Sequence, residues 1–122
     1  MRVVAAIACA LMLLCMGVLP GHAEKRVALV IGNSTYTKVP QLPNPANDAT
    51  AIAAMFRDAG FDVVQTKTNL DLASMRRALR DFTDAVRDAD MVVVFYAGHG
   101  IEVGGTNYLI PVDATLERDI DA

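Results

Sequence analysis

Apolar runs and helical patterns alternate along the chain from residue 25 onward. Residues 27–31 and 91–95 are continuously apolar and rich in β-branched side chains, which is typical of strands buried on both faces of a parallel sheet. Residues 61–68 are more polar and predict a strand nearer a sheet edge. Helical patterns separate these runs, so the order is strand, helix, strand, helix, strand. This order predicts an open α/β sheet with right-handed crossovers.

The two helical patterns have recognisable ends. The first begins at Asn44-Pro45, because Asn caps free amides and Pro is tolerated in the first turn. It ends at Ala59-Gly60, where glycine suits a left-handed cap. The second is capped by Asn69-Leu70-Asp71 and ends at 88–90. The side chains expected to face the core are Ile52, Met55 and Phe56 in the first helix and Leu72, Met75, Leu79, Phe82 and Val86 in the second.

Residues 101–110 predict a β-hairpin, since two strand-like runs flank a Gly-Gly pair that suits a tight primed turn. The predicted fold is therefore α/β. It is an open, mostly parallel sheet flanked by helices in three layers, with a hairpin after the 91–95 strand. A sheet of three parallel strands leaves an apolar flank beside that last strand. We therefore expect the fold to be completed by missing C-terminal strands or by a partner.

The first 23 residues are expected to be a secretory signal peptide. Arg2 precedes the uncharged residues 3–19, and residues 21–23 form a small-x-small cleavage site. The alternative is an uncleaved membrane anchor, but the apolar run is slightly short of the roughly 20 residues that a span requires. We expect cleavage, export to the periplasm or the medium, and no stable membrane insertion afterwards. Residues 24–122 then form one domain.

Charge and cysteine content change this picture. The chain has 11 Lys+Arg against 14 Asp+Glu and a net charge of −3, which argues against an electrostatic nucleic-acid binder. Charges between residues 57 and 87 are interleaved, as on a solvated helix face. Both cysteines, Cys9 and Cys15, lie in the expected signal peptide. The domain therefore has no disulfide, no thiolate metal site and no cysteine nucleophile, and its acidic run 113–121 is expected to be a solvated segment.

His99 is the residue best suited to chemistry. It is the one histidine after the expected cleavage site, and it follows a strand at the carboxyl edge, where ligands collect in open α/β sheets. Residues 32–36 and 97–100 should meet there if their strands are neighbours, with Asn47-Asp48 near the same edge. An imidazole between two glycines can approach another chain and exchange a proton near neutral pH. The competing interpretation is a histidine that only hydrogen-bonds a loop.

Other kinds of site are disfavoured by spacing. Gly98-x-Gly100 is followed by Val103 where a dinucleotide fingerprint needs glycine, and it precedes a hairpin. The sequence contains no phosphate loop, and one histidine with scattered acids lacks metal-ligand spacing. Ser34 and Ser74 do not lie in a nucleophile elbow. We therefore expect no cofactor and no metal, and a small-molecule-binding α/β domain is the weakest functional hypothesis.

Four segments together resemble the caspase-like cysteine peptidases, the clan of caspases, metacaspases and paracaspases. They are residues 25–33, 42–49, 60–61 and 94–100. The similarity extends to about residue 113 and covers the front part of the large-subunit domain; bacterial members with signal peptides belong to this family. The resemblance implies a caspase-like fold and a cysteine-type endopeptidase acting on polypeptides.

The resemblance also implies roles for three residues. His99 matches the catalytic histidine, which pairs with a cysteine thiolate and protonates the leaving amine. Gly100 matches the glycine whose backbone N–H helps form the oxyanion hole. Asp48 matches an acid of the metacaspase-like branch that favours Arg or Lys before the cleaved bond. Its other interpretation is stabilisation of the helix N-terminus.

The family's nucleophilic cysteine is expected about 50 residues after the histidine, beyond the end of the given sequence. Two hypotheses follow. In the first, the chain is an N-terminal fragment or truncated product of an exported caspase-like peptidase and carries only the His half of a His-Cys dyad. In the second, it is a non-catalytic caspase-like module that binds a partner, or a second copy, through the flank of the 91–95 strand.

Overall fold

The computed structural model describes residues 23–117. Apart from Ala23, the expected signal peptide with both cysteines lies outside the described residues, as does the part of the acidic run from residue 118 onward. No helix in the described range is long and apolar enough to cross a membrane. The elements are, in order, β1 (Arg26–Gly32), α2 (Pro45–Asp58), β2 (Val63–Thr68), α3 (Leu72–Ala85), β3 (Met91–Ala97), β4 (Gly100–Val103) and β5 (Thr106–Leu109).

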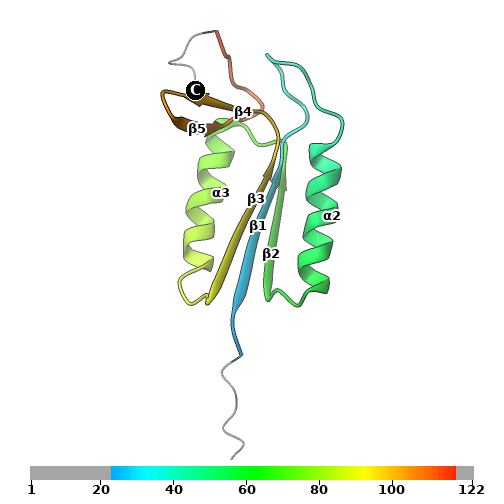
Figure 1. The fold of residues 1–122 in the computed structure, drawn as a ribbon, viewed down its shortest axis with the longest axis vertical. Helices are drawn as coiled ribbons and strands as arrows, with labels where there is room; N and C mark the ends of the chain where they lie inside the picture. The colour runs from blue at the N-terminus through cyan, green and yellow to red at the C-terminus, as the bar shows by residue number, and fades with distance from the viewer. Residues whose placement is uncertain (1–22, 118–122) are drawn as a thin grey trace, which may run out of the picture.

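The first three strands form a parallel sheet in the order β2-β1-β3. Its two helices lie on opposite faces, α2 on one and α3 on the other, which gives three layers (Figure 1). Each crossover from one strand to the next contains a helix, as parallel pairing requires. The predicted α/β class and element order are confirmed, as is the burial of residues 27–31 on both faces.

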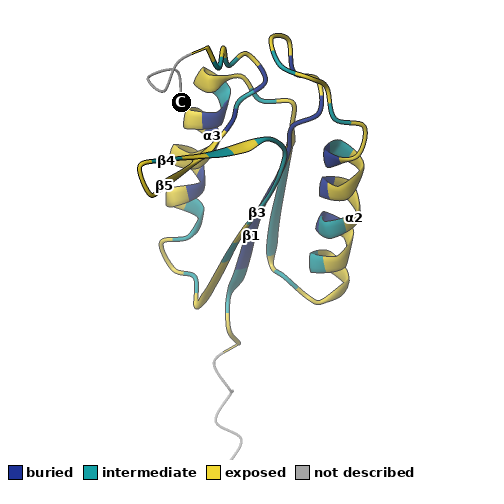
Figure 2. Cartoon of the chain, turned by 45° about the horizontal axis from the view of Figure 1, so that its top comes forward, coloured by how far each residue is buried: buried dark blue, intermediate teal, exposed yellow. Residues whose placement is uncertain are grey.

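The core lies on both faces of β1, which is dark along most of its length in Figure 2. On one face, Leu29 and its neighbours in β1 pack against Phe82 of α3. On the other, Val30 packs against Ala49 and Ala53 of α2. Burial of apolar side chains on both faces is what holds this central strand in place.

The helix faces differ in part from the predicted ones. In α3, Met75 and Phe82 are buried as expected, but Leu72 and Leu79 are exposed and Ala78 is buried instead. In α2, the buried side chains are small, whereas Met55 is exposed. The reason in α2 is a close approach to the sheet. A Cβ on Gly32 would overlap the carbonyl oxygen of Pro45 and meet the Ala49 Cβ at 2.8 Å.

The helix ends show one correction. Asp71 caps α3 as its position suggested, since its carboxylate accepts from the Ser74 N–H at 2.7 Å. This hydrogen bond lowers the pKa of Asp71 below its usual value. Asn44 lies at the N-cap of α2 but makes no side-chain cap. The free Ala46 N–H is bound instead by the Ser34 hydroxyl at 3.0 Å, so the loop between β1 and α2 folds back to cap this helix.

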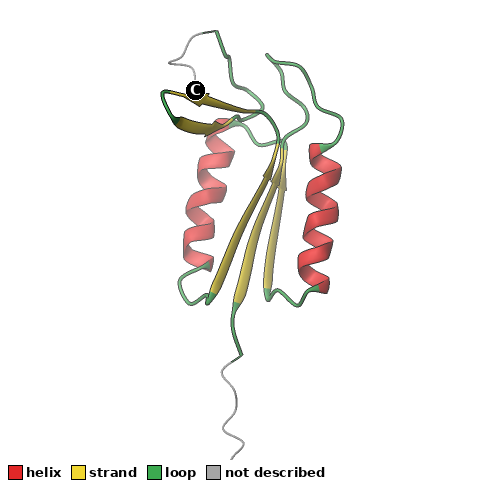
Figure 3. Ribbon diagram, viewed as in Figure 1, coloured by secondary structure: helices red, strands yellow, loops and turns green. Residues whose placement is uncertain are grey.

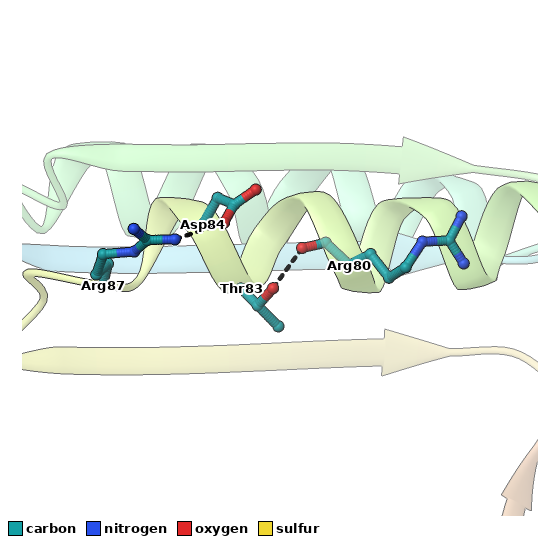
Figure 4. A network of polar contacts seen from close by, with 4 residues as sticks. All are labelled: Arg80, Thr83, Asp84 and Arg87. Atoms are coloured by element: carbon teal, nitrogen blue, oxygen red, sulfur yellow. Dashed lines mark hydrogen bonds and ion pairs between the residues drawn. The ribbon is translucent and has the colours of Figure 1, made fainter.

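The solvent side of α3 carries the interleaved charges. Arg87 and Asp84 form an ion pair of 3.0 Å, with both side chains largely exposed. The Thr83 hydroxyl donates to the Arg80 carbonyl in the same helix (Figure 4). These contacts are local, and exposed ion pairs contribute little to stability. The prediction of a solvated helix face is confirmed here.

The hairpin and the β3 flank complete the described fold. β4 and β5 pair antiparallel, and Gly104 and Gly105 have φ of 56° and 82°, which confirms a primed turn. The expectation that residues 91–95 are buried on both faces is wrong, because among residues 23–117 β3 has a strand neighbour on one side only. Its side chains are exposed to 45–50% at the following positions: Met91, Val92 and Val94. The predicted apolar flank is thus confirmed.

Candidate active site

The loops that follow β1 and β3 meet at the carboxyl end of the sheet. The Asn33 N–H donates to the Ala97 carbonyl at 2.9 Å, and the His99 N–H donates to the Tyr36 hydroxyl at 2.8 Å. Figure 3 shows the loops gathered at this end of the strands. The predicted meeting of the two loops is confirmed, because β1 and β3 are neighbours in the sheet.

The His99 imidazole is half-buried and held on two sides. Its Nε2 lies 2.7 Å from the Pro40 carbonyl oxygen, which can only accept a hydrogen bond, so Nε2 carries the proton. The ring lies against Tyr36, with centroids 4.5 Å apart and planes tilted by 60°. In the neutral ring the lone pair is then on Nδ1. This nitrogen is the one that can take a proton from another group.

Two tyrosine hydroxyls contact the backbone of His99. The Tyr96 hydroxyl is 2.8 Å from the His99 carbonyl and 2.9 Å from the Ile110 carbonyl. It also lies 3.1 Å from the Tyr36 hydroxyl. Burial raises the pKa of Tyr96 well above that of an ordinary tyrosine, and the hydrogen bond with Tyr36 raises it further. Tyr96 therefore stays protonated and remains a hydrogen-bond donor at neutral pH.

Asn33 and Gly98 fix the two loops that carry this cluster. Asn33 is fully buried; its Oδ1 accepts from the Leu70 N–H at 2.9 Å and its Nδ2 donates to the Ile110 carbonyl at 3.3 Å. At Gly98, a Cβ would lie 2.5 Å from the Tyr96 hydroxyl and 2.6 Å from that of Tyr36. Glycine is thus required at position 98 for the tyrosine hydroxyls to approach the backbone.

Gly100 is exposed at the start of β4, and its N–H points away from β5. The Ile110 N–H donates to the His99 carbonyl at 3.0 Å, while Gly100 is registered opposite Leu109. In an antiparallel ladder this pattern makes Gly100–Leu109 a non-hydrogen-bonded pair. The Gly100 N–H is therefore directed away from the hairpin partner β5. Gly100 directly follows His99 in the chain.

Asp48 lies on the first turn of α2 and is exposed. Within residues 23–117 no hydrogen bond or ion pair of its carboxylate is found. The Ser34 cap on Ala46 ties this turn to the same edge of the sheet as His99. The structure thus brings His99 and Gly100 together and leaves Asp48 on a neighbouring helix end, where a carboxylate also stabilises the helix.

Sequence reasoning missed four parts of this site. They are the side chains of Asn33, Tyr36 and Tyr96 and the carbonyl of Pro40. One signal was present, because a tyrosine at the end of a buried strand needs a hydrogen-bond partner when it is covered. The carbonyl gave no signal, since every residue has one. In the described part of the chain, no three His, Asp or Glu side chains are grouped so that they could hold a metal ion.

The family model described as the caspase domain matches residues 25–121. The chain therefore belongs to the caspase-domain family of cysteine peptidases, and the resemblance noted in the sequence is confirmed.

Two curated relatives are similar to it. The human mucosa-associated lymphoid tissue lymphoma translocation protein 1 is 36% identical over 94 residues, and its homolog from Mus musculus is 35% identical over 94 residues. Each alignment covers 75% of this chain and 11% of the relative, so the chain spans about a tenth of their length.

Proposed function

We propose that this chain provides the histidine half of the catalytic dyad of a caspase-family cysteine endopeptidase. One observation supports this most directly. The Pro40 carbonyl engages Nε2 of His99 at 2.7 Å, which leaves the Nδ1 lone pair for proton transfer. The outward N–H of Gly100 adjoins it in the chain. A general base beside a hydrogen-bond donor is the arrangement that acyl transfer requires.

The reaction uses both groups. Nδ1 of His99 takes the proton of a cysteine thiol, and the thiolate attacks the carbonyl carbon of the scissile peptide. The carbonyl oxygen gains negative charge and accepts a hydrogen bond from the Gly100 N–H. The imidazolium then gives its proton to the leaving amine, and water hydrolyses the thioester. The thiol must come from outside residues 24–122, which contain no cysteine.

Reading the coding DNA beyond codon 122 tests where the thiol comes from. We expect a further strand ending in an Asp-x-Cys-like motif. The full-length product should then react with an active-site thiol probe, and His99→Ala should abolish the reaction. Asn107→Ala, an exposed change on β5, is the control and should leave it intact. Equal labelling of the wild type and His99→Ala would contradict the dyad.

For substrates, we propose polypeptides cleaved after Arg or Lys, with Asp48 pairing with the cationic side chain. An exposed carboxylate with no partner of its own among the described residues supports this role. The test is cleavage of matched peptides by the full-length product. Asp48→Asn should raise KM for Arg and Lys peptides, whereas Asp58→Asn at the other end of α2 should not. Equal effects of both changes would restrict Asp48 to helix stabilisation.

We propose export for the localisation, on the basis of the N-terminal pattern alone. The protein should occur in the periplasmic or secreted fraction of a bacterial cell, with Glu24 as its first residue by N-terminal sequencing. Retention of residues 1–23 in a membrane fraction would instead support an uncleaved anchor.

A second candidate function is a non-catalytic interaction module. It is favoured by the uncharged β3 flank, where three apolar side chains are exposed to 45–50%. A sheet edge without charge or proline readily pairs with another chain. Sedimentation of the given chain should then show a complex or homodimer that Val94→Lys disrupts, with Met55→Lys on α2 as the control. A wild-type monomer would count against it.

A further inference from the structure

Tyrosine hydroxyls hold both backbone groups of His99. Its N–H donates to the Tyr36 hydroxyl at 2.8 Å, and its carbonyl lies 2.8 Å from the Tyr96 hydroxyl. The same carbonyl also accepts from the Ile110 N–H at 3.0 Å. The ring of Tyr36 lies against the imidazole. Backbone and side chain of His99 are therefore fixed by the same two tyrosines.

Each polar group of this cluster has a hydrogen-bond partner. The Tyr36 oxygen accepts from His99, so its single proton goes to the Ile110 carbonyl at 3.1 Å or to the Tyr96 oxygen. Asn33 Nδ2 also donates to the Ile110 carbonyl. The Tyr96 hydroxyl can therefore donate its proton to the His99 carbonyl. Within residues 23–117, no buried side-chain nitrogen or oxygen lacks a partner. A fully satisfied polar network is rigid.

The orientation of Gly100 follows from the same contacts. His99 C=O and Gly100 N–H belong to one planar trans peptide, in which the two groups point in opposite directions. Because Tyr96 and Ile110 hold the carbonyl on one side, the Gly100 N–H must point to the other. The hydroxyl of Tyr96 thus acts on the direction of this N–H through a single rigid unit.

We propose that Tyr36 and Tyr96 are positioning residues: Tyr36 holds the His99 backbone and ring so that Nε2–H meets the Pro40 carbonyl, and Tyr96 aims the Gly100 N–H outward. The role rests on the proposed function, in which these two groups act on a polypeptide substrate. Both tyrosines act through other groups, and neither is assigned a proton-transfer step. Gly98 is part of the same arrangement, since only glycine at this position leaves room for the hydroxyls of Tyr36 and Tyr96.

The test uses nuclear magnetic resonance on the given chain, so it needs no cysteine and no activity. The variants Tyr36→Phe and Tyr96→Phe each remove one oxygen and keep the ring. Tyr108→Phe is the matched control, because Tyr108 is 36% exposed on β5 and makes no side-chain hydrogen bond within the described residues. Three quantities are measured: the ring 15N shifts of His99, the exchange rate of its amide, and the order parameter of the Gly100 amide.

In the wild type, the ring shifts should show the Nε2–H form, and the Gly100 amide should have a rigid order parameter of about 0.85. Tyr36→Phe removes the acceptor of the His99 N–H, so exchange of that amide should speed up about tenfold. The loosened imidazole should leave the Pro40 carbonyl part of the time, which shifts the ring signals towards a mixture of tautomers. Tyr96→Phe should lower the order parameter of Gly100 while the β1 amides stay protected. Tyr108→Phe should match the wild type in all three quantities.

The proposal is overturned if both core variants match Tyr108→Phe in these quantities, even when they lower the melting temperature, because a merely structural role predicts that result. Should a variant fail to fold, the His99 tautomer and the Gly100 order parameter of the wild type alone decide whether the positioning role stands. A mixed tautomer or a mobile Gly100 amide overturns the positioning role, and the expected values support it. Loss of the proposed peptidase function would appear separately, as a full-length product that does not react with the thiol probe although these spectra are as expected.

Discussion

β1 and β3 are neighbouring strands with similar apolar sequences, yet their side chains differ greatly in exposure. Leu29 of β1 and Val94 of β3 are register partners on the same face of the sheet. Leu29 is fully buried, whereas Val94 is 50% exposed. In the described part of the chain, β1 has a strand on each side and a helix over each face, while β3 has one strand neighbour and α3 packs mainly over β1.

The contrast shows that an apolar run identifies a strand but not its place in the sheet. Burial on both faces requires neighbours that the run itself does not specify. The two strands also differ in the kind of surface they present. The ends of β1 and β3 hold a polar cluster with fixed geometry, whereas the outer edge of β3 is an apolar surface able to pair with another chain.

Leu29→Ala and Val94→Ala test the contrast with the largest expected effect. Leu29→Ala should lower the free energy of unfolding by about 2–5 kcal/mol, because it leaves a cavity in the core. Val94→Ala should lower it by less than about 1 kcal/mol, since half of its surface is already in water. Urea unfolding followed by circular dichroism measures both. Equal losses would mean that β3 is covered in solution.

Asn33→Ala tests the polar end of β1. It leaves the Leu70 N–H without its acceptor and removes one donor to Ile110, so the free energy of unfolding should fall by about 1–3 kcal/mol. The control is Asn107→Ala on exposed β5, which should change it by less than about 0.5 kcal/mol. Equal small effects in the same unfolding assay would show that the loop cluster is not held by this side chain.

Alkaline pH tests the end of β3 through Tyr96. The folded-state pKa of Tyr96 is raised by burial, so the folded protein binds this proton more tightly than the unfolded chain does. The resulting stability is present below about pH 10, the usual pKa of tyrosine, and is lost progressively as pH rises above it. Urea midpoints of the wild type should fall more steeply with alkaline pH than those of Tyr96→Phe. Parallel curves would contradict the raised pKa.

Acid pH tests the helix that covers β1 and has the smallest expected effect. The pKa of Asp71 is lowered in the folded state by its hydrogen bonds to Ser74. Its contribution to stability is therefore present above the unfolded pKa and lost as pH falls through the lowered value. Asp71→Asn should remove this part of the acid dependence while keeping a capping oxygen. Helix content measured against pH checks it, and an unchanged acid midpoint would argue against the cap.

Much of the candidate site followed from the sequence, and the rest depended on packing. His99 and Gly100 were identifiable because a strand end, two glycines and a family motif coincide in a few residues. Tyr36 and Pro40 were not, since their contact with His99 joins loops about sixty residues apart. The cap of α2 was misassigned to Asn44 because a local rule chose the adjacent side chain, whereas the path of the preceding loop placed Ser34 at the helix end.

By itself the sequence determined the element order, the parallel class of sheet, the hairpin turn and the family, because each is encoded by local periodicity or by short motifs. Only the tertiary structure decided which apolar strand is covered, which helix residues face inward, and which carbonyl holds the imidazole. These features depend on the neighbours that distant segments provide. Local patterns fix what a segment is, but burial and hydrogen-bond partners are properties of pairs of segments.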